Sequence, residues 1–101
     1  MDLAKLIADK REQILKAAAK YGARNVRVFG SVARGDHGDT SDVDFLVSMD
    51  DAGLKGIHYF GAIERLCEEL EKILGCRVDV VDEKGLRERI RDQVLSEAKA
   101  I

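Results

Sequence analysis

The stretch Gly30-Ser31-Val32-Ala33-Arg34-Gly35 leads, after five intervening residues, into Ser41-Asp42-Val43-Asp44-Phe45-Leu46-Val47. The second part is an apolar run that carries two aspartates, Asp42 and Asp44, at alternate positions. Because side chains alternate along a β-strand, both carboxylates are expected on one face. Two negative charges about 6–7 Å apart repel by roughly 2–3 kcal/mol at an effective dielectric constant near 20. A divalent cation between them converts this repulsion into binding, so the pair predicts a metal site.

The glycine and serine that precede the aspartates indicate a phosphate site. Gly30 ends a predicted strand, and a glycine there lets the backbone approach a phosphate closely. The turn beginning at Ser31 presents free N–H groups, and its hydroxyl adds one more donor. Arg34 can offer a planar donor fork to phosphate oxygens.

Simpler interpretations of these residues stay open at the level of sequence. Ser31 can cap a short helix. Arg34 can equally form surface ion pairs with Asp36 or Asp39. A pair of alternating aspartates can also be the ordinary polar face of a strand.

Hydrophobic periodicity predicts the remaining elements. The expected helices cover residues 2–20, 60–74 and 86–101, and the expected strands cover residues 26–29, 42–48 and 77–81, with a helical turn at 31–35 and a loop at 36–41. The buried stripe of the second helix is predicted to be Phe60, Ile63, Cys67, Leu70 and Leu74. These elements predict an α+β fold, a small α/β sandwich with a short mixed sheet of about three strands and helices packed on one face.

A third aspartate, Asp79, lies between two valines of the last predicted strand. If that strand runs beside the one that carries Asp42 and Asp44, all three carboxylates can meet at one site. Three carboxylates around one or two Mg²⁺ ions form a hard-oxygen site that leaves positions open for substrate phosphates. The alternative is that Asp79 is a solvated polar residue on an exposed strand face.

Composition limits the classes of protein to which the chain can belong. Its 101 residues, 46% of them hydrophobic, suit one domain over residues 1–101. A net charge of −2 argues against sequence-independent nucleic-acid binding. No apolar run reaches the roughly 20 residues of a membrane span, and no secretory leader is evident, so a cytoplasmic protein is expected. Cys67 and Cys76 lack metal-site spacing and are expected to be reduced core residues.

The pattern G-S-x-A-R-G, S-D-x-D-F-x-V and a later strand aspartate resembles the nucleotidyltransferase fold of the DNA polymerase β superfamily. The string is most similar to the minimal nucleotidyltransferase branch, and the resemblance covers nearly the whole chain. It implies transfer of AMP from ATP to a hydroxyl group. By this resemblance Asp42, Asp44 and Asp79 hold Mg²⁺, two ions in all, and serve catalysis, while Gly30 and Ser31 hold the triphosphate, with Arg34 beside them.

The same resemblance implies a partner. Members of this branch are often encoded beside a HEPN-domain ribonuclease toxin, and they act as antitoxins that adenylylate a tyrosine of that toxin. The chain lacks the appended helical domain with which larger relatives grip their acceptors, and a partner protein can supply that part, in a homo- or hetero-oligomer. Two other functions stay open: nucleotidylation of a small antibiotic-like molecule, and a binding-only antitoxin that masks its toxin through the faces around Phe60 and Ile90.

Overall fold

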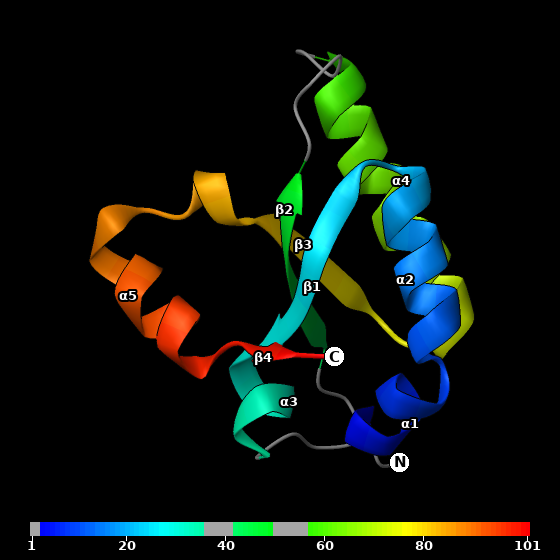
Figure 1. The fold of residues 1–101 in the computed structure, drawn as a ribbon, viewed down its shortest axis with the longest axis horizontal. Coiled ribbons are helices and arrows are strands. Elements are labelled where there is room, and N and C mark those ends of the chain that lie inside the picture. The colour runs from blue at the N-terminus through cyan, green and yellow to red at the C-terminus, as the bar shows by residue number, and fades with distance from the viewer. Residues whose placement is uncertain (1–2, 36–41, 50–56) are drawn as a thin grey trace.

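The protein folds around a four-stranded mixed β-sheet with strand order β3-β2-β1-β4 (Figure 1). The computed structural model describes residues 3–35, 42–49 and 57–101. The strands are β1 (Ala23–Phe29), β2 (Val43–Met49), β3 (Val78–Asp82) and β4 (Lys99–Ala100). The helices are α1 (Leu3–Asp9), α2 (Arg11–Lys20), α3 (Gly30–Arg34), α4 (Ile57–Leu74) and α5 (Glu88–Glu97), and a 3-10 turn covers Glu83–Gly85.

The central strand pair fixes the rest of the sheet. β1 is antiparallel to both β2 and β4, whereas β2 and β3 are parallel and are connected through α4. Figure 1 shows α2 and α4 together on one side of the sheet and α5 on the other. The α+β class and the mixed sheet are therefore as predicted, and α5 adds a helix on the second side.

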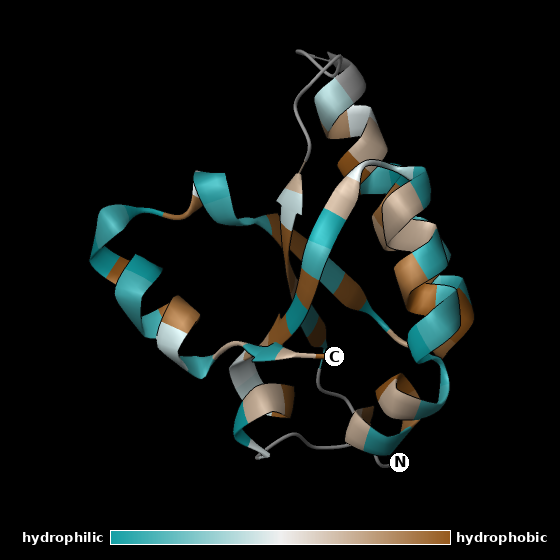
Figure 2. Ribbon diagram, viewed as in Figure 1, coloured by the Kyte–Doolittle hydropathy of each residue, from teal (hydrophilic) through white to brown (hydrophobic). Residues whose placement is uncertain are grey.

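One face of the sheet carries the core. In β2, Val43, Phe45 and Val47 have no exposed surface. They alternate along the strand with Asp44 and Ser48, which lie on the opposite face. Figure 2 shows hydrophobic residues concentrated along β2 and β3, while most of α5 is hydrophilic. Since no residue of α5 is buried, the apolar contacts that stabilise the fold come mainly from the side that carries α2 and α4.

The structure differs from the sequence prediction at both ends of the chain. The predicted helix over residues 2–20 is two helices, interrupted at Lys10, whose ψ of 12° departs from helical geometry. The predicted terminal helix ends at Glu97, and the chain then forms β4 against β1. A strand of two residues is too short to produce an alternating pattern, so the sequence carried no signal for it.

The predicted buried stripe of α4 is wrong at its N-terminal end. Phe60 is 70% exposed, whereas Leu66, which was not assigned to the stripe, is fully buried together with Leu70. Figure 1 shows the N-terminal part of α4, to which Phe60 belongs, extending past the ends of the strands. Cys67 and Cys76 are half-buried free thiols at the margin of the core.

A polar network lies on the face of the sheet opposite the core. Arg27 of β1 donates hydrogen bonds to Glu83 Oε2 at 3.1 Å and to Ser48 Oγ at 3.4 Å. The Ser48 hydroxyl donates to the same Glu83 oxygen at 2.9 Å. These hydrogen bonds, that of Ser48 first, lower the pKa of the Glu83 carboxyl. The network ties β1 and β2 to the turn that follows β3.

Replacing Glu83 with Gln is expected to lower thermal stability at neutral pH but not in acid. The folded protein holds the pKa of Glu83 below its ordinary value of 4.5, so the carboxylate stabilises the fold above that pH and loses its effect as the pH falls through the folded pKa. The loss is less than about 1 kcal/mol because the side chain is 26% exposed. Melting curves at pH 7 and pH 3 test this, with the exposed Asp92→Asn as control; an equal loss at both pH values contradicts it.

Candidate active site

Two predicted site residues lie side by side on neighbouring strands. The parallel pairing of β2 with β3 sets Asp44 directly beside Asp79, and the pairing of β1 with β2 sets Phe29 on the other side of Asp44. Residues in register on adjacent strands share a face and are about 5 Å apart. Phe29, Asp44 and Asp79 thus form a row across three neighbouring strands. We call the two aspartates of this row, Asp44 and Asp79, the carboxylate row.

Gly30 is packed directly against this row. It follows β1 with a φ of +72°, a conformation that side chains rarely adopt. A Cβ atom at this position would collide with Oδ2 of Asp44. The glycine therefore serves two purposes here: it allows the sharp turn from β1 into α3, and it leaves room for the carboxylate.

The surroundings of Asp44 destabilise the charged form of its carboxyl. The pKa of its carboxyl is raised, first by burial, then by the negative charges of Asp79 and Asp42, while Arg34 opposes the shift. Burial and the two aspartates disfavour the charged form of the carboxyl, whereas Arg34 favours it. The protein therefore gathers negative charge at a place where the fold alone gains nothing from it.

Asp42 lies just before β2 and is exposed. The next residue is anchored, because the Val43 N–H donates to the Arg77 carbonyl at 3.0 Å at the start of the β2–β3 ladder. Within residues 3–35, 42–49 and 57–101, no group of three or more His, Cys, Asp or Glu side chains is close enough to hold a metal ion. The carboxylates thus stand in a row rather than in a closed cage. Their chemistry nonetheless suits Mg²⁺, which takes hard oxygen donors and needs few protein ligands.

Ser31 and Arg34 belong to the short helix α3. The residue at its N-cap is Phe29, so Ser31 lies in the first turn and not at the cap position. Arg34 pairs with Glu97 of α5 at 3.3 Å, a partner that sequence reasoning missed because 63 residues separate the two. The predicted alternatives, Asp36 and Asp39, lie outside the described residues. The ion pair connects the candidate site to α5.

Nothing in the described part of the chain has the form of a transmembrane segment, since none of its helices is both long and apolar enough to cross a bilayer.

Comparison with known proteins identifies the family. Residues 10–101 match the family described as "Nucleotidyltransferase domain". The protein adenylyltransferase MntA of Thermococcus cleftensis is 37% identical over 100 residues, which cover 94% of this chain and 96% of the relative. A Methanocaldococcus jannaschii protein assigned as a protein adenylyltransferase is 38% identical over 82 residues, which cover 81% of this chain and 77% of the relative.

Solved structures agree with this match. A protein assigned as a minimal nucleotidyltransferase superposes with a TM-score of 0.83 at 46% identity, covering 100% of this chain and 97% of the other. A toxin–antitoxin structure with AMP-PNP gives a TM-score of 0.70 at 24% identity over 88% of this chain and 69% of the other, which shows a shared fold. Together with relatives above 30% identity, these matches show that the chain is an enzyme of the nucleotidyltransferase domain family.

Proposed function

We propose that this protein is a single minimal nucleotidyltransferase domain that transfers AMP from ATP to a hydroxyl group of a partner protein. The observation that carries the proposal is the carboxylate row, in which Asp44 lies beside Asp79 and against Gly30. This arrangement concentrates negative charge beside a backbone turn that only glycine allows, as a metal-dependent phosphoryl site requires.

The proposed reaction uses the residues in distinct roles. The oxygen of the acceptor hydroxyl forms a bond to the α-phosphorus of ATP, and the bond from that phosphorus to the bridging oxygen breaks, releasing pyrophosphate. Asp42, Asp44 and Asp79 would hold Mg²⁺, which would supply positive charge to neutralise the charge that develops on the phosphate oxygens. Asp79 accepts the hydroxyl proton, and Gly30 and Ser31 orient the triphosphate at the start of α3.

The proposed acceptor is a tyrosine of a HEPN-domain toxin, for which this protein acts as the antitoxin in the cytoplasm. The support is the name of the Thermococcus cleftensis relative, a protein adenylyltransferase, and the fold that this protein shares with a chain of toxin–antitoxin structures. A tyrosine hydroxyl on a partner is a suitable nucleophile because it needs only one proton acceptor, which Asp79 can provide.

A binding-only antitoxin is the second candidate function. Phe60 and Ile90 are large hydrophobic residues that are 70% and 48% exposed, and such residues can contact a partner without any catalysis.

The test is to incubate the protein with ATP, Mg²⁺ and the protein encoded beside its gene, and to measure the partner's mass. A gain of one or more AMP groups on a tyrosine supports the proposal. Neutralisation of the partner with no gain in mass supports the binding-only function instead. Transfer of AMP to a small hydroxyl compound without any partner protein would indicate the antibiotic-modifying function.

A further inference from the structure

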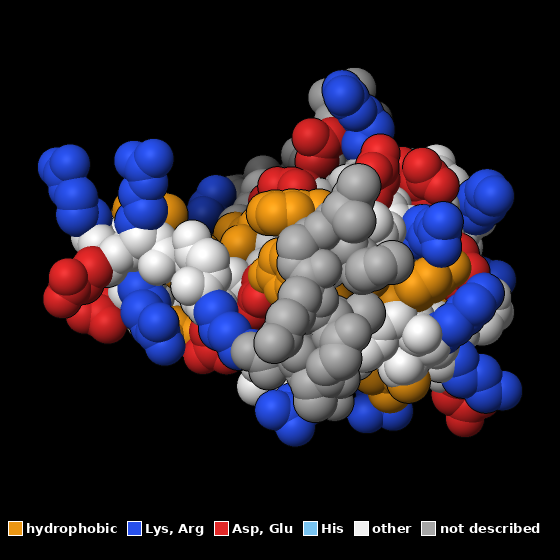
Figure 3. Space-filling view, turned by 90° about the horizontal axis from the view of Figure 1, so that it is seen from above, with side chains coloured by type: hydrophobic (Ala, Val, Ile, Leu, Met, Phe, Trp, Pro, Cys, Tyr) orange, Lys and Arg blue, Asp and Glu red, His pale blue; other side chains and the backbone are white. Residues whose placement is uncertain are grey.

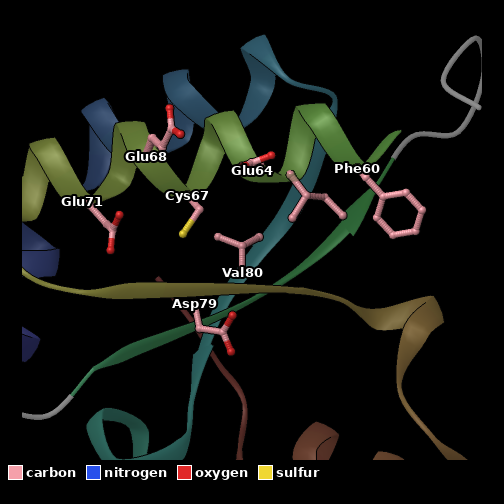
Figure 4. Close-up of a pocket in the computed structure, with 8 residues that line it drawn as sticks. Phe60, Glu64, Cys67, Glu68, Glu71, Asp79 and Val80 are labelled. Atoms are coloured by element: carbon pink, nitrogen blue, oxygen red, sulfur yellow. The ribbon is translucent and has the colours of Figure 1, made fainter. Parts of the chain in front are cut away.

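A groove of about 510 Å³ lies between α4 and the edge strand β3 (Figure 4). Its floor is apolar and includes Ile63 and Cys67 of α4 and Val80 of β3. Figure 4 shows Cys67 directed from α4 toward β3 and Val80 directed back toward α4. Asp79 also lines the groove, but its side chain projects from the opposite side of β3. The groove therefore adjoins the candidate active site, with a single strand between them.

Side chains of α4 bind the backbone of β3 at one point of this edge, and no strand among the described residues pairs with the edge farther along. The N–H of Val78 donates to Glu71 Oε2 at 3.1 Å, and its carbonyl accepts from Cys67 Sγ at 2.9 Å. Because backbone groups alternate along a strand, the N–H and C=O of Val80 face the same edge. An extended segment lying along this edge can pair with Val80, as in strand addition to a sheet.

An exposed aromatic side chain stands at the far end of the groove. Phe60 is 70% exposed and packs edge-to-face on Tyr59, with ring centroids 5.3 Å apart. The Tyr59 hydroxyl in turn donates to the buried Asp82. The phenyl ring of Phe60 is thus held in place by Tyr59, which is itself hydrogen-bonded. An exposed aromatic ring held in this way can bind an apolar side chain of a partner.

The groove is negatively charged. Glu64 and Glu68 are exposed carboxylates one helical turn apart on its rim, Glu71 lies beside them, and no Lys or Arg is among the described residues that line it. Burial and then the charges of these glutamates and Asp79 raise the pKa of the Cys67 thiol. Figure 3 shows acidic side chains beside apolar ones on the upper part of this face, with basic side chains among them, and both basic and acidic side chains at the end on the left. The charge of this groove therefore favours a basic segment.

We propose that the groove between α4 and β3 docks a basic segment of the acceptor protein, with an apolar side chain of that segment on Phe60. This inference rests on the proposed function and adds how the acceptor is recognised. A segment extended along the edge of β3 directs alternate side chains to opposite sides of the sheet. Those on the α4 side contact the groove, while a hydroxyl side chain in register with Asp79 lies beside the carboxylate row.

The test compares groove variants with a charge-matched control. Phe60→Ala removes the aromatic anchor, and the double variant Glu64→Lys/Glu68→Lys reverses the rim charge. All three side chains are exposed, so folding should be unaffected, as melting curves can verify. The double variant Asp9→Lys/Glu12→Lys changes the net charge equally but lies on α1 and α2. Each groove variant is expected to raise the KM for the acceptor protein roughly tenfold or more, with kcat and the KM for ATP unchanged.

A binding assay makes the inference independent of the natural acceptor. The probe is a fluorescent extended peptide in which every second residue, on the side that faces α4, is Lys or Leu, while one of the intervening residues is Tyr and the others are Ser. Its control carries Glu in place of Lys. The wild type should bind only the basic peptide, and Glu64→Lys/Glu68→Lys should lose that binding. Equal binding by the wild type and this variant, or an unchanged KM for the acceptor protein, overturns the docking groove while leaving the transfer activity intact. Absence of AMP transfer by the wild type to any protein instead contradicts the proposed function.

Discussion

Replacing Asp44 with Asn is expected to abolish AMP transfer and, at the same time, to make the protein more stable. Transfer should fall by about a thousandfold or more, because the variant loses a carboxylate that is proposed to bind Mg²⁺, together with its charge. Stability should rise by about 0.5–1 kcal/mol, or roughly 3–6 °C in Tm, because the amide removes a partly buried charge that Asp79 and Asp42 repel. A residue that serves stability alone would not show this opposite pair of effects.

The gain in stability should depend on pH in a defined direction. The folded protein raises the pKa of Asp44 above its ordinary value of 3.8, so the proton binds more tightly in the folded state. The wild type therefore carries the full penalty above the folded pKa and loses it as the pH falls toward the ordinary value. The difference in Tm between variant and wild type should be largest at neutral pH and vanish in acid. Asp92→Asn, an exposed change on α5, should alter neither activity nor stability, and a destabilised or active Asp44→Asn protein contradicts the assignment.

Replacing Gly30 with Ala is expected to reduce both stability and transfer. The backbone φ of +72° costs a side chain about 1–2 kcal/mol, and the new Cβ would push the Asp44 carboxylate out of its position. A displacement of about 1 Å at a reacting centre can cost roughly a hundredfold in rate. Equilibrium unfolding in denaturant and a pyrophosphate-release assay measure the two effects.

Gly35 offers a matched control for this substitution. It has a φ of +79°, but a Cβ there would meet no atom within 4 Å among the described residues beyond its chain neighbours. Gly35→Ala should therefore show a similar loss of stability from the backbone alone and keep the transfer activity. If both alanine variants lose activity to the same extent, the contact between Gly30 and Asp44 is not what matters, and the role assigned to Gly30 is wrong.

Local signals in the sequence predicted the central part of the fold. The strand that ends at Gly30, the helical turn after it and the alternation around Asp44 are all properties of neighbouring residues, and the structure contains each of them. The adjacency of Asp44 and Asp79 was predicted only on the condition that their strands are neighbours, which no local pattern decides. The functional roles of these residues stay predictions until the variants are measured.

The features that the sequence did not reveal depend on contacts between distant segments. Leu46 lies on the face of Asp44, yet it is fully buried, and its neighbours in register are Arg27 of β1 and Val81 of β3. The ion pair of Arg34 with Glu97 joins α3 to α5 in the same way. The break at Lys10 interrupts a hydrophobic pattern that continues with helical spacing on both sides, so periodicity alone could not locate it.

The strand register that aligns Asp44 with Asp79 also has a consequence for the specific activity of a preparation of this protein. A slip of β2 by one residue would turn Asp44 into the core and expose Phe45, because alternate residues face opposite sides. Such a misfolded molecule would be both unstable and inactive. A preparation of this protein is therefore expected to contain no long-lived species with partial activity, and its specific activity should report directly the fraction of correctly folded molecules.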